Sequence, residues 1–115
     1  MRNALTLSPE IRAALADGMP VVALESTVIA HGLPHPDNLE TSQAMEQAVR
    51  DAGAVPATIA VVDGRIRVGL SAEDRAHLAD PDADIAKLSR RDIAACVVVG
   101  GTGATTVSAT MICAQ

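Results

Sequence analysis

The sequence predicts an α/β fold, in the form of a three-layer α/β/α sandwich around a mixed sheet. Apolar, β-rich runs such as 21–24 and 58–62 alternate along the chain with segments of helical spacing such as 38–52. One pair of runs is joined only by Asp63-Gly64, which is typical of an antiparallel hairpin. Alternating strands and helices build a sheet with helices on its faces, and the hairpin makes this sheet mixed.

The chain starts with a predicted helix and a predicted strand. Ser8 is a good N-cap, Pro9 fits the first helical turn and Gly18 is a stop signal, so residues 9–17 are predicted to be helical. The run 21–24 is apolar throughout, which indicates a strand buried on both faces.

A polar loop and a longer helix come next. Residues 25–37 contain prolines, histidines and a glycine, a composition that predicts a loop. Apolar residues then recur at helical spacing over 38–52, and Gly53 supplies the C-cap.

The hairpin is the strongest local signal. Its second strand, 65–70, alternates charged and apolar residues and therefore has one face in water, whereas the first, 58–62, is more deeply buried. Ser71 and Asp74 resemble a capping box that opens a short helix to Leu78.

The last third predicts a strand, a glycine-rich turn and a helix. The run 96–99 indicates another buried strand, and the turn at 100–106 leads into helical spacing over 107–112.

Composition sets the class of protein. The 115 residues fit one domain, and 9 basic against 14 acidic residues give a net charge of −5. Phe, Trp and Tyr are absent, so the core must be small and aliphatic, and we expect further chain or a subunit partner to stabilise it.

Charge and hydropathy argue against several classes of partner. The acidic balance and the lack of aromatic residues argue against binding to nucleic acid or an anionic membrane. We find no apolar span of membrane length and no signal-peptide core, so we expect a cytoplasmic protein. Cys96 and Cys113 lie in apolar runs without CxxC spacing, which favours buried thiols.

Two segments are candidate phosphate sites. The glycine-rich turn precedes a helix, where free amides from Gly101 to Thr106 would bind an anion; the alternative is a set of tight-turn glycines that let the helix pack. Lys87, with the serine and arginines of 89–91, would position a phosphorylated or carboxylated ligand. The alternative for this segment, which we favour on sequence alone, is a solvated loop that balances nearby aspartates.

Glu25 is a candidate acid. It ends a predicted buried strand, where α/β sheets place their ligands, and partial burial there would raise its pKa and suit a proton donor. Capping of the next turn is the alternative, and it is equally well supported. A metal site formed with His31 and His35 is disfavoured, because Pro34 prevents a helical pair of ligands.

Four separated segments resemble the pseudouridine-5′-phosphate glycosidase family, which includes the indigoidine-cluster A proteins. They are VVALESTVIAHGLPHPDN, GAVPATIAVVDGRIRVGLS, KLSRRD and GATTVSATM, in the family's order. The resemblance implies that residues 1–115 are the N-terminal part of a single domain, because family members are more than twice as long. It also implies reversible cleavage of the C–C glycosidic bond of pseudouridine 5′-phosphate to uracil and ribose 5-phosphate.

The same resemblance assigns roles to single residues. It implies that Glu25 is the proton donor, that Lys87 binds substrate and that Val107 contacts it. The family's imine-forming lysine and the aspartate that binds manganese (Mn2+) are expected beyond Gln115, so this chain alone is expected to be inactive. Full-length relatives are expected to form homotrimers.

The two candidate phosphate sites are expected to converge on one pocket. We assign phosphate to the turn at Thr105 and Thr106, and the sugar to Lys87, although a strand over 96–99 would hold these two sites roughly 13 Å apart. The alternative function is a non-catalytic module for sugar-phosphate binding or assembly.

Overall fold

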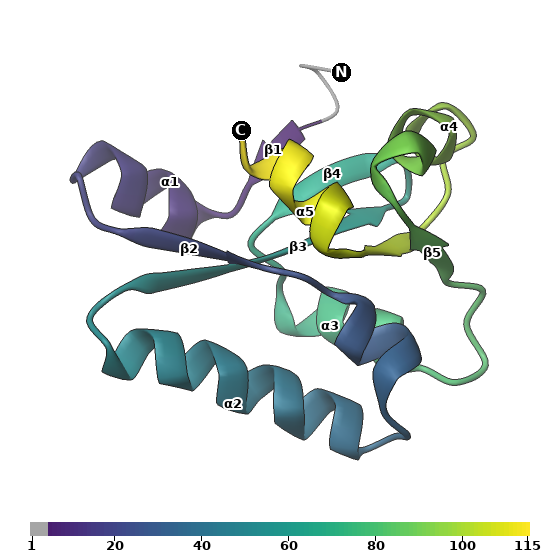
Figure 1. The fold of residues 1–115 in the computed structure, drawn as a ribbon, viewed down its shortest axis with the longest axis horizontal. Coiled ribbons are helices and arrows are strands. Elements are labelled where there is room, and N and C mark those ends of the chain that lie inside the picture. The colour runs from purple at the N-terminus through teal and green to yellow at the C-terminus, as the bar shows by residue number, and fades with distance from the viewer. Residues whose placement is uncertain (1–4) are drawn as a thin grey trace.

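The computed structural model describes residues 5–115, which form a six-stranded sheet with helices on both faces (Figure 1). The elements, in chain order, are β1 (Leu5–Leu7), α1 (Pro9–Ala16), β2 (Val21–Leu24), the π-helix η2 (Val28–Gly32), α2 (Asp37–Asp51), β3 (Val55–Val62), β4 (Arg65–Val68), α3 (Ala72–Ala79), β5 (Ala86–Leu88), the 3-10 helix η3 (Arg90–Asp92), α4 (Ile93–Val98), β6 (Gly103–Thr105) and α5 (Val107–Ala114).

The sheet is mixed, as predicted. Its order is β1-β4-β3-β6-β5, and β2 pairs with β3 outside this path. The central strand β3 is antiparallel to β4 and β6 and parallel to β2, whereas β1 is parallel to β4 and β5 is parallel to β6.

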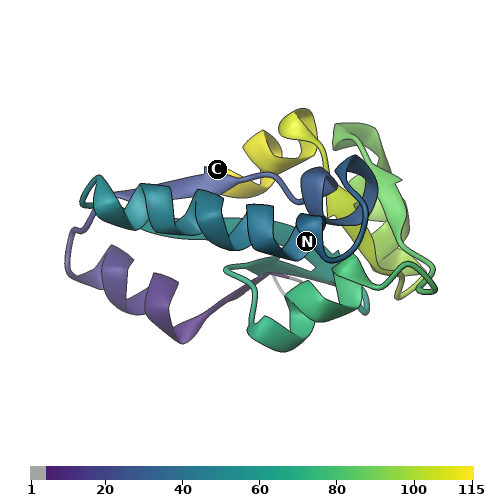
Figure 2. The same ribbon diagram turned by 90° about the horizontal axis from the view of Figure 1, so that it is seen from below.

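Two apolar clusters, one on each face of the sheet, make the three layers. Ile59 and Val61 of β3 belong to the cluster that includes Ile11 of α1 and residues of α4 and α5. The intervening Ala60 and Val62 belong to the second cluster, with residues of η2 and α3. Figure 1 shows α1, α5 and α4 above the sheet and α2 and α3 below it, and Figure 2 shows α2 lying across the lower face. The predicted fold class is therefore confirmed.

The predicted local signals at the hairpin and the helix starts are confirmed. Asp63 and Gly64 both have positive φ, 50° and 78°, as a type I′ turn requires. The Ser8 hydroxyl caps α1 by accepting from the Ile11 amide at 3.3 Å. Ser71 and Asp74 form the reciprocal capping box of α3.

The predicted strand at 96–99 is wrong, because these residues lie in and just after helix α4. Val98 and Val99 are 83% and 79% exposed, so this end of the run is not core. The place beside β3 is taken instead by Gly103–Thr105, which lies within the predicted glycine-rich turn. A β-branched run favours a strand only where a buried position in the sheet is open to it.

Two smaller predictions also need correction. The segment 25–37 is not all loop, because it includes the π-helix η2, whose Ile29 is fully buried. Residues 21–24 do form a strand, but β2 is only partly buried, and Val22 is 41% exposed. β2 pairs with β3 alone, so its other edge has no strand partner within residues 5–115.

Asn38 fixes η2 against the lower layer of helices. Its buried side-chain amide donates to the carbonyl of Ile29 at 2.8 Å and to the carbonyl of Ala79 at 3.1 Å. These two bonds hold the start of η2, the start of α2 and the end of α3 together. Within residues 5–115, no helix is long and apolar enough to span a membrane.

Candidate active site at the converging strand ends

The carboxyl ends of three strands meet beside the middle of β3. β4 occupies one edge of β3, and β2 and β6 lie one after the other along the opposite edge, running in opposite directions. Their carboxyl ends therefore approach head to head. β5 runs parallel to β6, with Leu88 beside Thr105, so its carboxyl end reaches the same place.

Hydrogen bonds join the ends of β2 and β6 directly. The Ser26 amide donates to the Thr105 carbonyl at 3.1 Å, and the Thr105 amide donates to the Ser26 hydroxyl at 2.8 Å. The Thr27 hydroxyl also donates to the Thr105 carbonyl, at 2.9 Å. Ser26 and Thr105 are both 0% exposed, so this junction is part of the core.

The predicted site residues all lie at or beside this junction. Glu25 is half-buried and precedes Ser26, and Thr106, also half-buried, follows Thr105. Val107, the first residue of α5, is 63% exposed. Lys87 is exposed and precedes Leu88, whose carbonyl accepts from the Thr106 amide at 2.9 Å. The structure thus brings Glu25, Thr106 and Val107 to the junction and places Lys87 on the neighbouring strand β5, and the roles of all four in binding and catalysis stay predictions.

The predicted separation between Lys87 and the glycine-rich turn is wrong. The roughly 13 Å estimate assumed a strand over 96–99. Instead, Lys87 lies directly opposite Ala104 in the parallel pairing of β5 and β6. The two segments therefore lie on neighbouring strands, and their convergence on one pocket stays a prediction.

The predicted cradle of free amides is also wrong for three of its residues. The Gly101 amide donates to the Cys96 carbonyl at 2.9 Å, and the amides of Thr105 and Thr106 are engaged as described above. The buried Thr105 hydroxyl donates to the Ile59 carbonyl at 2.6 Å. Substrate contact through Thr105 stays a prediction, while its bonds give it a structural role. Amides without an intrahelical partner start at Val107, in the first turn of α5.

The basic segment after β5 is partly ordered by its own hydrogen bonds. The Ser89 amide and hydroxyl donate to the Asp92 carboxylate at 2.9 and 2.7 Å, and these bonds hold the pKa of Asp92 below its usual range. The Arg90 amide donates to the Ser108 hydroxyl at 3.2 Å, which ties the segment to α5. Neither Lys87 nor the two arginines form an ion pair within residues 5–115, so the predicted balance with nearby aspartates is not seen as direct contacts.

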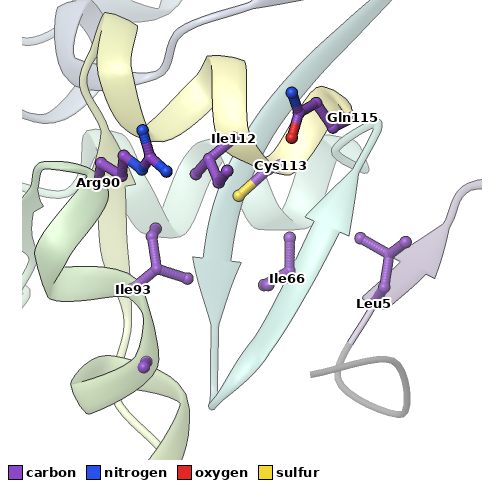
Figure 3. A pocket seen from close by; sticks show the side chains of 8 residues that line it. Leu5, Ile66, Arg90, Ile93, Ile112, Cys113 and Gln115 are labelled. Carbon is purple, nitrogen blue, oxygen red and sulfur yellow. The ribbon is translucent and has the colours of Figure 1, made fainter.

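Two of the hollows near this region bear on the predicted residues. One, of about 440 Å³, is lined mainly by apolar side chains under the end of α5, with Arg90 at its rim (Figure 3). It includes none of the predicted site residues. The other, of about 450 Å³, is lined by Lys87 together with Asp84, Asp92 and Thr102. The second hollow is therefore the one that a ligand of Lys87 would enter.

The described residues do not assemble a metal site. No group of three His, Cys, Asp or Glu side chains in residues 5–115 lies close enough to hold an ion, and His31 and His35 are both exposed. Cys96 is buried and Cys113 half-buried, and burial raises the pKa of both thiols. The prediction of a buried thiol is confirmed for Cys96.

Sequence reasoning missed Ser26 and Thr110 as parts of this region. The Thr110 hydroxyl of α5 lies 2.9 Å from that of Thr105, and Ser26 completes the buried group. The available signal was a serine one residue beyond an apolar strand, because a hydroxyl that is buried there needs a partner from another element.

This arrangement defines a three-layer α/β protein with a candidate ligand site at the carboxyl ends of its strands. Residues 10–115 match the family described as Indigoidine synthase A like protein, and the chain belongs to this family.

Curated relatives cover the whole chain at high identity. It is 63% identical to a pseudouridine-5′-phosphate glycosidase of Paracoccus denitrificans over 96% of its own length and 37% of the relative's. It is also 63% identical to a protein of the same name in Rhodospirillum centenum, over 100% of this chain and 35% of the relative. The chain thus spans about a third of the length of these relatives.

Solved structures agree with the fold. A prealnumycin C-glycosynthase in complex with ribulose 5-phosphate superposes with a TM-score of 0.83 at 44% identity, over 96% of this chain and 35% of that one. An indigoidine synthase A-like protein of Thermotoga maritima gives 0.78 at 33% identity, over 94% of this chain and 34% of the other.

Proposed function

We propose that this chain forms part of an enzyme that reversibly cleaves the C–C glycosidic bond of pseudouridine 5′-phosphate, giving uracil and ribose 5-phosphate. The observation that carries the proposal is the junction of β2 and β6, where Glu25 and Thr106 each lie next to one of the two bonded residues Ser26 and Thr105, and beside which β5, the strand of Lys87, ends. The names of the relatives and the sugar phosphate in the C-glycosynthase support the same class of substrate.

The chemistry explains why an acid is needed at this junction. When the bond between the sugar and the uracil ring carbon breaks, that carbon keeps the electron pair and must gain a proton. Glu25, half-buried at the end of β2, is placed to donate it. The electron demand at the sugar is met, in this proposal, by imine formation on a lysine, and the resemblance places that lysine outside this chain.

Lys87 and the first turn of α5 would hold the sugar phosphate. Lys87 lines a hollow beside β5, and the amides of the first turn of α5, before that of Thr110, have no partner within the helix, so an anion is favoured there. Binding at both ends would orient the substrate toward Glu25.

Manganese, a homotrimer and a cytoplasmic location complete the proposal. Residues 5–115 do not fit a metal by themselves, because no three suitable side chains gather. The ligands would therefore come from elsewhere, and no step of the chemistry above is assigned to the ion.

Replacing Glu25 by glutamine tests the proposal. The test protein is a chimaera in which residues 1–115 replace the segment they match in the Paracoccus denitrificans relative. We expect Glu25→Gln to lower kcat by about 10²–10⁴-fold with little change in KM, because a proton donor acts in the transition state and the amide keeps the shape.

The matched control is Glu40→Gln, which makes the same change at an exposed position of α2 and should leave the kinetics unchanged. Near-normal kcat in the Glu25 variant would show that this carboxylate is only a structural cap. Binding of pseudouridine 5′-phosphate without any cleavage by the unmodified chimaera would favour the non-catalytic module.

A further inference from the structure

A group of three hydroxyls lies inside the apolar core at the junction of β2 and β6. Ser26 and Thr105 are 0% exposed and Thr110 is 6% exposed. A hydroxyl buried without a partner costs several times what a paired one contributes, so this group persists only because its members bond to each other and to the backbone.

The direction of each bond in this group is determined. The Thr105 hydroxyl has one proton, which it donates to the Ile59 carbonyl at 2.6 Å. It must therefore accept from Thr110 at 2.9 Å and from Ser26 at 3.3 Å. The Ser26 oxygen also accepts from the Thr105 amide at 2.8 Å, so the two residues hold each other reciprocally.

These bonds fix the backbone on both sides of Glu25. On its amino side, Leu24 is paired with Thr58 in the parallel ladder of β2 and β3. On its carboxyl side, Ser26 bonds to Thr105 through both its amide and its hydroxyl. Glu25 is thus a single residue between two fixed residues, Leu24 and Ser26. Ser26 is bonded to Thr105, the residue that precedes Thr106.

We propose that Ser26 is a positioning residue, whose hydroxyl holds Glu25 in fixed register with Thr106 and Val107. The inference rests on the proposed function, in which Glu25 donates a proton to a substrate held at the start of α5. A proton donor needs a placement accurate to a fraction of an ångström, and residues that support it through the backbone provide this accuracy.

Thr110 offers a matched control for a purely structural role. Ser26→Ala and Thr110→Val each remove one hydroxyl that is bonded to the same Thr105 oxygen. Neither substitution introduces a larger side chain. Only Ser26 lies on the strand that carries Glu25. Urea unfolding of both variants measures whether their losses of stability are comparable.

Amide hydrogen exchange on the chimaera tests the positioning directly. We expect Ser26→Ala to speed exchange at residues 25–27 by roughly tenfold relative to Thr110→Val, because only the first variant frees this segment. Equal exchange in the two variants overturns the positioning role. Thr27→Val, which removes the half-buried tie to the Thr105 carbonyl, replaces Ser26→Ala in the comparison if that variant does not fold.

Kinetics of the chimaera give the second readout. We expect Ser26→Ala to lower kcat for pseudouridine 5′-phosphate by about 10- to 10²-fold at nearly constant KM, and Thr110→Val to keep kcat near that of the unmodified chimaera. Equal kcat values for the two variants overturn the positioning role. An unmodified chimaera without activity would overturn the proposed function instead, and the exchange comparison would still decide whether Ser26 fixes Glu25.

Discussion

Thr106 is the side chain on which the assignment of the phosphate group depends. It is half-buried at the start of α5, and its hydroxyl lies 3.3 Å from that of Ser108. We expect Thr106→Val in the chimaera to weaken binding of pseudouridine 5′-phosphate by about tenfold or more, because a hydrogen bond to a charged group is lost.

Binding of unphosphorylated pseudouridine is the control for this prediction, and titration calorimetry measures both ligands. The nucleoside should bind the variant and the unmodified chimaera almost equally. Equal losses for the two ligands would mean that Thr106 contacts the sugar or base, or shapes the site, rather than the phosphate.

Single residues of the candidate site were predictable to different degrees. Glu25 and Lys87 follow from the motifs they lie in, and the position of Glu25 at the end of a strand follows from the apolar run before it. The bonds of Ser26 to Thr105 join residues 79 positions apart. No local pattern encodes such a contact, because it depends on which strands lie along the same edge of β3.

At the scale of elements, local signals decided which segments were predicted correctly. The Asp63-Gly64 hairpin and the cap of α3 are built from neighbouring residues, and both are confirmed. The predicted strand at 96–99 is wrong because two segments, 96–99 and 103–105, compete for the same position beside β3. Gly103–Thr105 takes the place beside β3, and the chain before it remains helical as α4.

Gly103 lets β6 lie close against the Leu88 side chain of β5. A Cβ at this position would lie 2.6 Å from both Cγ and Cδ1 of Leu88, on the neighbouring strand β5. We expect Gly103→Ala to lower the free energy of unfolding by about 1–3 kcal/mol through overpacking, measured by urea denaturation.

Gly32→Ala is the matched control for Gly103→Ala, because its added Cβ would meet only ordinary contacts, at 3.5 Å or more. This control should change stability by no more than about 0.5 kcal/mol. If the two variants were equally stable, Leu88 would have room to move and β5 would not depend on a glycine in β6.

The ion pair between α1 and α2 predicts a pH dependence. Arg50 donates to both carboxylate oxygens of Glu10, at 2.6 and 3.0 Å, and these hydrogen bonds lower the pKa of Glu10. A lowered folded-state pKa stabilises the fold above the unfolded value of about 4.5, and this contribution is lost as the pH falls below it. Both side chains are about half exposed, so the effect should stay below about 1 kcal/mol.

A double-mutant cycle with Glu10→Gln and Arg50→Gln measures this contribution. The coupling free energy from urea unfolding should be favourable at pH 7 and close to zero at pH 3, and added salt should reduce it at pH 7. Coupling of the same size at both pH values would show that the contact does not depend on the carboxylate charge.

At the scale of the whole molecule, the composition and the fold agree. The fully buried side chains of the core are mainly aliphatic, such as Ile11, Ile29, Ile59 and Leu78, as the absence of aromatic residues predicts. Burial is highest along β3, whereas Leu15, Met111 and Val98 at the periphery are more than half exposed. The chain spans about a third of the length of the relatives it matches.

Lys87 is the single lysine of the chain, so imine formation on a lysine of these 115 residues can be tested at one position. Lysines that form imines are typically enclosed in apolar pockets or placed next to another cation, whereas Lys87 is exposed on an edge strand and lines an open hollow with two aspartates. We therefore expect the 115-residue chain, incubated with pseudouridine 5′-phosphate and sodium borohydride, to release no uracil and to gain no mass by mass spectrometry. Lys87→Arg is the control, because it measures any mass gained on borohydride treatment by a chain that has no lysine. A reduced sugar-phosphate adduct on Lys87, together with uracil release, would show that this lysine can act as the nucleophile and that the reaction needs no second lysine from elsewhere.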